Sequence, residues 1–228
     1  MAHGAGGAMT SPFLETMAGL LAERGIAVTR FEFAYMAAQR SGGKRMPPPK
    51  AERLVPELRK VVEEVGKRRG RREILLIGGK SLGGRVASLL ADELQGEGRI
   101  AGLVCLGYPF HPPGKPERLR TEHLVQLRAP ALIVQGERDP FGSRAEVEQL
   151  LLSPSIRFHW VGDGDHDLAP RGGTGCTRRG NLEAAADAIV DFAKSLRQQP
   201  AHTTAGTGSG SGRRRGSRCG RSTPLRRG

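Results

Sequence analysis

Gly79-Lys80-Ser81-Leu82-Gly83 is the stretch that decides the fold, because it follows the apolar run Ile74–Ile77 and precedes the helical pattern Arg85–Ala91. A serine between glycines, at a strand-to-helix junction, is typical of a tight, strained turn that presents the hydroxyl as a nucleophile. The first N–H groups of the following helix point at charge developing on an attacked carbonyl. The stretch therefore predicts Ser81 as a nucleophile and the N–H of Leu82 as an oxyanion donor.

Two later segments supply an acid and a base in the chain order that such a serine requires. Ala131–Gln135 has the pattern of a buried strand, and Asp139 follows it in a turn, where active sites of open α/β sheets gather. The next strand, Ile156–Val161, leads into a glycine-flanked loop whose His166 can reach both a serine and a carboxylate. The pattern predicts a triad of Ser81, Asp139 and His166.

The alternative interpretations are structural. Asp139 precedes a proline and can serve as a turn former, and His166 can be a solvated loop residue. Three other acids stand next to His166 in the sequence, namely Asp163, Asp165 and Asp167. They are weaker candidates for the acid, because close neighbours in sequence rarely orient a histidine ring.

The N-terminal segment His3-Gly4-Ala5-Gly6-Gly7 offers a second part of an oxyanion site. Its glycines allow the backbone to approach a ligand closely, and a His-Gly-x-Gly loop supplies an oxyanion N–H in many esterases. We predict that the N–H of Ala5 has this role. The alternative is an ordinary flexible terminus.

The order of strands and helices favours an α/β fold with a mostly parallel sheet that helices cover on both faces. Expected strands are 26–33, 73–78, 100–106, 131–135 and 156–161. The first expected helix starts at Ser11-Pro12 and ends at Gly25. Further helices are expected over 54–65, 85–91, 145–152 and 181–196. The long, proline-rich loop 108–116 lies at a position where enzymes of this fold often carry a lid, a segment that covers the active site. We expect one domain over residues 1–197 and a tail over 198–228.

Composition limits the class of protein. No apolar run approaches the roughly 20 residues of a membrane-spanning helix, and no signal-peptide pattern is visible at the start. Three widely spaced cysteines, Cys105, Cys176 and Cys219, indicate neither a disulfide framework nor a zinc site. We therefore expect a cytoplasmic protein without membrane contact.

The net charge of +13 is unevenly distributed. Residues 192–228 contain nine basic residues and no acidic ones. A Gly/Ser/Thr/Arg-rich tail cannot bury a core, so we expect it to be disordered. Such a tail can bind nucleic acid weakly and non-specifically through phosphates, and the alternative is a solvated extension without function.

Together these motifs resemble the α/β-hydrolase superfamily, in its dienelactone-hydrolase-like branch. That branch includes the hydrolase-like domain of a subunit of the non-specific-lethal histone acetyltransferase complex. The resemblance covers roughly residues 2–197. The segments that carry it are His3–Gly7, Arg30–Phe33, Gly78–Arg85, Cys105–Phe110, Gly136–Gly142 and Asp163–Asp167.

The resemblance implies a three-layer fold and a serine hydrolase that acts on an ester or related small-molecule acyl substrate. Ser81 would be the nucleophile, Asp139 the acid and His166 the base, without a metal or organic cofactor. Residues 79–83 would form the nucleophile elbow, the tight turn that presents Ser81. Lys80 and Arg85 lie beside Ser81 at this elbow and either favour an anionic substrate or pair with carboxylates. The alternative function is a catalytically idle hydrolase fold that serves as a protein-interaction module. Substrate-binding residues and oligomeric state are not predicted.

One departure from the family pattern generates a prediction. In such folds a central apolar strand precedes the His-Gly loop, whereas only Met1-Ala2 precedes His3. Strands 26–33 and 73–78 would then lack a shared neighbour, which leaves buried backbone groups unpaired. We expect that the natural product begins upstream or that this form is poorly stable. Cooperative melting at an ordinary mesophile temperature, followed by calorimetry, would contradict this expectation.

Overall fold

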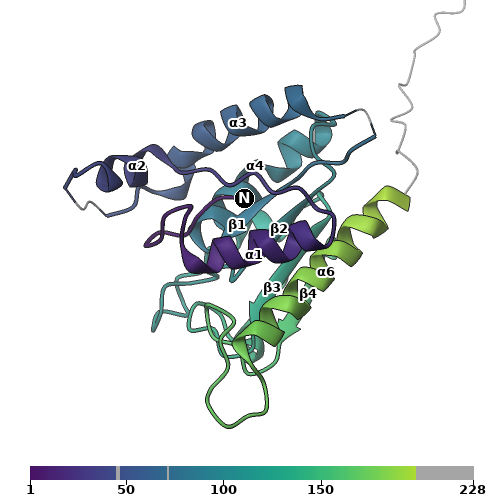
Figure 1. Cartoon of the computed structure of the whole chain (residues 1–228). Coiled ribbons are helices and arrows are strands. Elements are labelled where there is room, and N and C mark those ends of the chain that lie inside the picture. Colours follow the sequence, from purple (N-terminus) through teal and green to yellow (C-terminus); the bar gives the residue numbers. More distant parts are fainter. Residues whose placement is uncertain (45–46, 71, 199–228) are drawn as a thin grey trace, which may run out of the picture.

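Four parallel strands form the single sheet of the computed structural model, which describes residues 1–44, 47–70 and 72–198 (Figure 1). They are β1 (Leu76–Lys80), β2 (Gly102–Leu106), β3 (Ala131–Gly136) and β4 (Ile156–Val161). Their spatial order is β1-β2-β3-β4, so strands consecutive in the chain are neighbours. Because all four run in the same direction, their carboxyl ends meet at one edge of the sheet.

The helices form the two outer layers. Their bounds are α1 (Pro12–Glu23), α2 (Ala34–Arg40), α3 (Ala51–Arg68), α4 (Leu82–Gly96), α5 (Arg144–Val147) and α6 (Arg178–Gln198), with a 3-10 turn at Glu122–Leu124. Helices α1 and α6 pack on one face of the sheet, and α3 and α4 on the other (Figure 1). The predicted three-layer α/β fold is confirmed.

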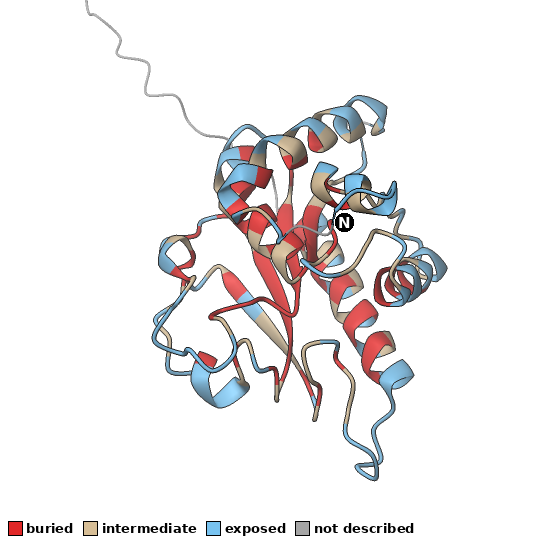
Figure 2. Ribbon diagram, turned by 90° about the vertical axis from the view of Figure 1, so that its left-hand side faces the viewer, coloured by how far each residue is buried: buried red, intermediate tan, exposed pale blue. Residues whose placement is uncertain are grey.

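Alternation along the strands produces two separate cores. In β2, Leu103 and Cys105 belong to the core under α3 and α4, whereas Val104 and Leu106 belong to the core under α1 and α6. Figure 2 shows most of the sheet buried, with the buried sides of the helices turned toward it. The exception is β4, whose central residues are half-buried or exposed. Both faces are apolar because helices cover both, as in other parallel sheets.

Helix boundaries follow local chemistry. Pro12 opens α1, and Gly25 follows its end with φ 78°, a conformation that glycine adopts without strain. The side chain of Ser11, which the sequence suggests as a cap, makes no capping hydrogen bond. Helix α5 is shorter than the predicted 145–152. A capping box of Ser143 and Glu146 starts it, and the chain then turns so that Leu150 and Leu152 pack against the core.

The predicted strand over 26–33 is wrong. This segment is mostly irregular, and Phe31 alone forms a bridge, with Ala2. Ala2 also bridges Gly79, so it lies between the two segments. Its N–H donates to the Gly78 carbonyl at 2.9 Å, and its carbonyl accepts from the Lys80 N–H at 3.0 Å. Segment 26–33 therefore pairs with Ala2 through one bridge and does not form a strand ladder.

Some expectations concern residues that the structure does not describe. These are the tail beyond residue 198, its contact with nucleic acid, and Cys219. Of the described cysteines, Cys105 and Cys176 are free thiols. Across the described ranges, no helix has both the length and the apolar character required to cross a membrane.

The packing of β1 against β2 predicts a strong effect of one methyl group. A Cβ at Gly78 would overlap the Val104 carbonyl oxygen, whereas nothing lies within 4 Å of a Cβ at Gly66 in helix α3. Gly78→Ala is therefore expected to lower the free energy of unfolding by about 1–3 kcal/mol. Gly66→Ala, the matched control, should raise it by about 0.5–1 kcal/mol. Urea unfolding measures both, and equal stability of the two variants would contradict this account.

Candidate active site

Ser81 stands at the sharp turn between β1 and α4, with φ 52° and ψ −115°. A residue with a Cβ pays about 1–3 kcal/mol for such a conformation, so the surroundings must impose it. They do so through hydrogen bonds and close packing: the Ser81 N–H donates to the Leu106 carbonyl at 2.9 Å. A Cβ at Gly83 would lie 2.6 Å from the Ala2 carbonyl oxygen, and one at Gly84 would lie 2.8 Å from that of Gly79. The glycines therefore permit the turn that the sequence predicts.

His166 and Asp139 meet at the carboxyl edge of the sheet. The Nδ1 of His166 lies 2.8 Å from Oδ2 of Asp139, whose side chain is fully buried. The ring of Phe141 packs against the imidazole at 4.3 Å between centroids. With Nδ1 donating its proton to the carboxylate, Nε2 carries the free lone pair. The imidazole is thus oriented to accept a proton at Nε2.

Gln135, at the end of β3, holds the buried acid in place. Its Nε2 donates to Oδ2 of Asp139 at 2.9 Å, while its Oε1 accepts from the Tyr108 N–H at 2.7 Å. The N–H of Phe141 donates to Oδ1 of Asp139 at 2.8 Å. Sequence analysis missed Gln135. The available signal was that Gln135 is a polar residue within the otherwise apolar β3. A polar side chain is buried in a sheet only when it has hydrogen-bond partners.

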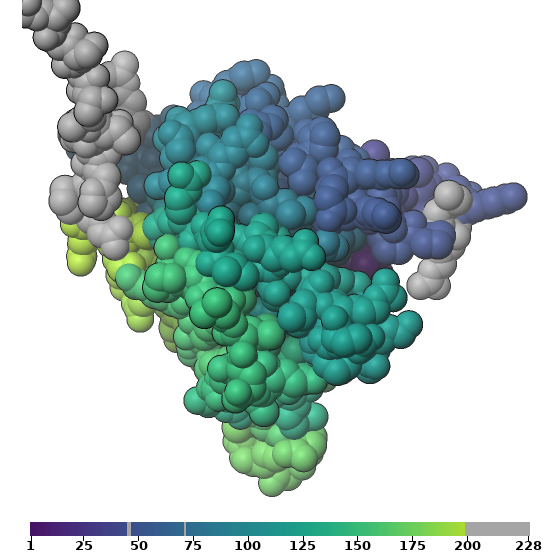
Figure 3. Space-filling view, turned by 180° about the vertical axis from the view of Figure 1, so that it is seen from behind, coloured from purple at the N-terminus to yellow at the C-terminus, as the bar shows by residue number. Residues whose placement is uncertain are grey.

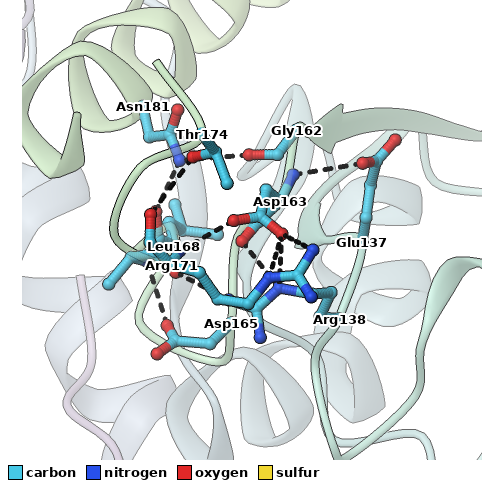
Figure 4. A network of polar contacts seen from close by, with 10 residues as sticks. Glu137, Arg138, Gly162, Asp163, Asp165, Leu168, Arg171, Thr174 and Asn181 are labelled. Atoms are coloured by element: carbon cyan, nitrogen blue, oxygen red, sulfur yellow. Dashed lines mark hydrogen bonds and ion pairs between the residues drawn. The ribbon is translucent and has the colours of Figure 1, made fainter. Parts of the chain in front are cut away.

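The other three acids near His166 have different partners. Figure 4 shows Asp163 between Arg138 and Arg171, with ion pairs of 2.8 and 2.7 Å. Asp165 Oδ1 accepts the N–H groups of Asp167 and Ala169. Asp167 forms an ion pair with Lys80 at 3.3 Å. Of the four candidate acids, Asp139 is the one whose carboxylate contacts His166.

The two cations that flank the elbow also have carboxylate partners. Lys80 is buried and pairs with Asp167, and Arg85 pairs with Glu52 at 2.9 Å. This arrangement corresponds to the second of the two sequence-based interpretations, in which these residues pair with carboxylates.

The N-terminal loop packs against the elbow. His3 is fully buried: its Nδ1 lies 2.7 Å from the Gly4 carbonyl, and its Nε2 accepts the Phe33 N–H at 3.1 Å. Burial lowers the pKa of His3, which favours the neutral ring that this pair of contacts requires. A Cβ at Gly4 would stand 3.5 Å from the Ser81 Cβ. The loop is therefore fixed beside the serine by a buried side chain.

Two backbone donors at this edge have no protein acceptor. Within residues 1–44, 47–70 and 72–198, the N–H groups of Leu82 and Ala5 make no hydrogen bond. The N–H of Leu82 is free because it opens α4, whose first N–H groups have no partner within the helix. Both are available to an incoming oxygen atom. Over the same ranges Ser81 Oγ has no hydrogen-bond partner, so its bond to His166 is not formed here.

The first part of the segment expected to form a lid, residues 108–111, is packed into the fold, whereas residues 113–116 are exposed. Tyr108 and Phe110 are fully buried, their rings lie 4.9 Å apart, and the Tyr108 hydroxyl donates to the Arg120 carbonyl at 2.9 Å. By contrast, residues 171–180 are exposed and form the light-green lobe at the bottom of Figure 3.

The chain belongs to the α/β-hydrolase family, because a family model described as an alpha/beta hydrolase domain matches residues 1–194. Solved structures agree with this fold. An α/β serine hydrolase without a lid from Xanthomonas campestris aligns with a TM-score of 0.63 at 20% identity, over 87% of this chain and 82% of that one. An α/β serine hydrolase homologue from Coxiella burnetii aligns at 0.58 and 22% identity, over 83% and 82%. A dienelactone hydrolase from Anabaena variabilis aligns at 0.59 and 20% identity, over 85% and 83%.

The buried contacts of Gln135 predict a large loss of stability on substitution. Gln135→Leu would leave the Tyr108 N–H without its acceptor and remove a donor from Asp139, at about 1–3 kcal/mol for each buried group. Gln149→Leu, at an exposed position, is the matched control and should be within about 0.5 kcal/mol of wild type. Urea unfolding distinguishes the two, and an unchanged Gln135→Leu protein would contradict the role given to Gln135.

Proposed function

We propose that this protein is a serine hydrolase that cleaves an ester or related acyl substrate. The observation that carries the proposal is the 2.8 Å contact of the buried Asp139 with His166, at the sheet edge where the strained Ser81 also stands. A carboxylate, an imidazole and a half-buried hydroxyl in these positions match the roles of acid, base and nucleophile.

The proposed reaction begins when Nε2 of His166 takes the proton of Ser81 Oγ, which attacks the substrate carbonyl. The resulting oxyanion accepts hydrogen bonds from the N–H groups of Leu82 and Ala5. The leaving alcohol departs with the proton from Nε2, and Ser81 holds the acyl group. His166 then deprotonates a water molecule, which attacks the acyl-enzyme. Ser81 Oγ leaves with the proton from Nε2, and the acid is released. Asp139 remains ionised and stabilises the imidazolium in both halves.

Each part of this reaction has support in the contacts around it. The α4 N-terminus favours negative charge next to Ser81, and the N–H of Leu82 at that terminus has no protein acceptor among the described residues. Asp139 is buried with donors on both oxygens, which fixes the carboxylate in place. The reaction uses no metal or cofactor.

The names of similar structures suggest the class of substrate. One is a dienelactone hydrolase, and another is a structure of Est1E from Butyrivibrio proteoclasticus with ferulic acid bound. Both names point to carboxylic esters, and we extend that class to a small-molecule substrate of this chain. A cytoplasmic location and weak binding of nucleic acid by the tail also remain proposals.

The alternative function is an idle hydrolase fold that serves as a protein-interaction module. Within the described residues Ser81 Oγ has no hydrogen bond to His166, and this does not by itself distinguish the two functions. In active hydrolases without ligand this bond is often long as well, so the observation is compatible with both functions.

A fluorophosphonate probe separates the two functions. We expect one covalent adduct on the wild type and none on Ser81→Ala, measured by intact mass. Turnover of short p-nitrophenyl esters should fall at least about a thousandfold in that variant. Ser41→Ala, at an exposed serine, is the matched control and should react like wild type. A folded wild type that forms no adduct would overturn the hydrolase proposal in favour of the interaction module.

A further inference from the structure

A buried cation next to the nucleophile has no part in the reaction as described. The side chain of Lys80 is only 8% exposed, and its Nζ lies 5.4 Å from the centre of the Phe13 ring in α1. Its ionic partner is Asp167, at 3.3 Å. An ammonium group is costly to bury, and an apolar residue would fill the same space without that cost. The position therefore calls for an explanation beyond packing.

Lys80 also lies close to the proposed base. Gly107, just after β2, has φ 62°, and a Cβ on it would stand 3.2 Å from Nδ1 of His166 and 3.2 Å from Nζ of Lys80. The two nitrogens are thus separated by at most twice that distance. At such a separation, through a partly buried region, two charges influence each other's protonation.

The ion pair connects two parts of the site that are distant in sequence. Lys80 is the residue immediately before Ser81 in the chain, and Asp167 is the residue immediately after His166. A link of 3.3 Å between their side chains therefore ties the turn that presents the hydroxyl to the loop that presents the imidazole.

Most charged groups near Lys80 and His166 are carboxylates. Asp139 faces His166 from the turn after β3, Asp165 and Asp167 come from the same loop, and α1 contributes the Phe13 ring. Burial lowers the pKa of Lys80, while Asp167, Asp139 and Asp165 oppose that change. Among these carboxylates the Lys80 ammonium is a positive charge that lies close to the imidazole.

We propose that Lys80 is a positioning residue for His166: its ion pair with Asp167 holds the histidine loop to the elbow, and its charge opposes protonation of the imidazole. This inference rests on the proposed function, because it assigns His166 the role of base. It accounts for the presence of a cation in a nearly closed position beside Ser81.

Two substitutions with opposite electrostatic signs test the inference. Lys80→Met removes the positive charge and should move the acid limb of the kcat/KM profile to higher pH by about one unit. Asp167→Asn removes a negative charge and should move it to lower pH. Lys80→Arg keeps the charge and should restore the wild-type limb. Lys60→Met, at an exposed lysine on α3, should leave it unmoved.

A purely structural role of Lys80 predicts a different result. Both variants would then lose kcat with the acid limb in its original place, and this result would overturn the inference. Should Lys80→Met fail to fold, Asp167→Asn decides alone, since its side chain is 60% exposed. Titration of the His166 ring by NMR provides the same midpoints without any substrate. Failure of the hydrolase proposal, seen as absent turnover, is thus distinguishable from failure of this one.

Discussion

The close approach of the Ala2 carbonyl to the glycines of the elbow is the constraint on which the site depends. A Cβ at Gly79 or Gly83 would overlap that carbonyl, so only glycine permits the contact. The contact brings the N-terminal loop, β1 and the start of α4 to one point. Ser81, the free N–H of Leu82 and the loop that carries Ala5 are all positioned by this packing, and a change at any of the three segments would displace the others.

The opposite side of the site depends on polar contacts instead of close backbone packing. Asp139 is fully buried, and donors from Gln135, Phe141 and His166 satisfy its two oxygens. A buried carboxylate is tolerated only with such partners. The same hydrogen bonds that offset the cost of burying the carboxylate also fix the direction of the imidazole. Stability and orientation therefore arise from one network, which is tied to β3 through Gln135.

Local signals predicted much of the fold. Pro12 and Gly25 bound α1, the apolar runs at β3 and β4 are strands as expected, and the glycines around Ser81 form the turn that their spacing predicts. These features depend on residues close in sequence. The candidate triad was found in the same way, since each member follows its own strand, although its roles remain predictions.

What the sequence did not reveal depends on contacts between distant segments. The segment 26–33 has strand-like composition, but strand formation requires a neighbour, and Ala2 offers only one bridge. Gln135 is an ordinary polar residue until Tyr108 and Asp139 surround it. His3 likewise acquires its role only when Phe33 reaches its ring. Such partners cannot be assigned from one sequence, because periodicity describes faces and not the residues that meet across them.

The backbone of Ser81 has an evolutionary consequence. Its φ of 52° is comfortable for glycine and unfavourable for any residue with a Cβ. Selection for folding alone would therefore replace this serine, and a lineage that no longer needed the hydroxyl would gain stability by losing it. A serine at this position is therefore not explained by folding alone, and this agrees with the role proposed for its hydroxyl.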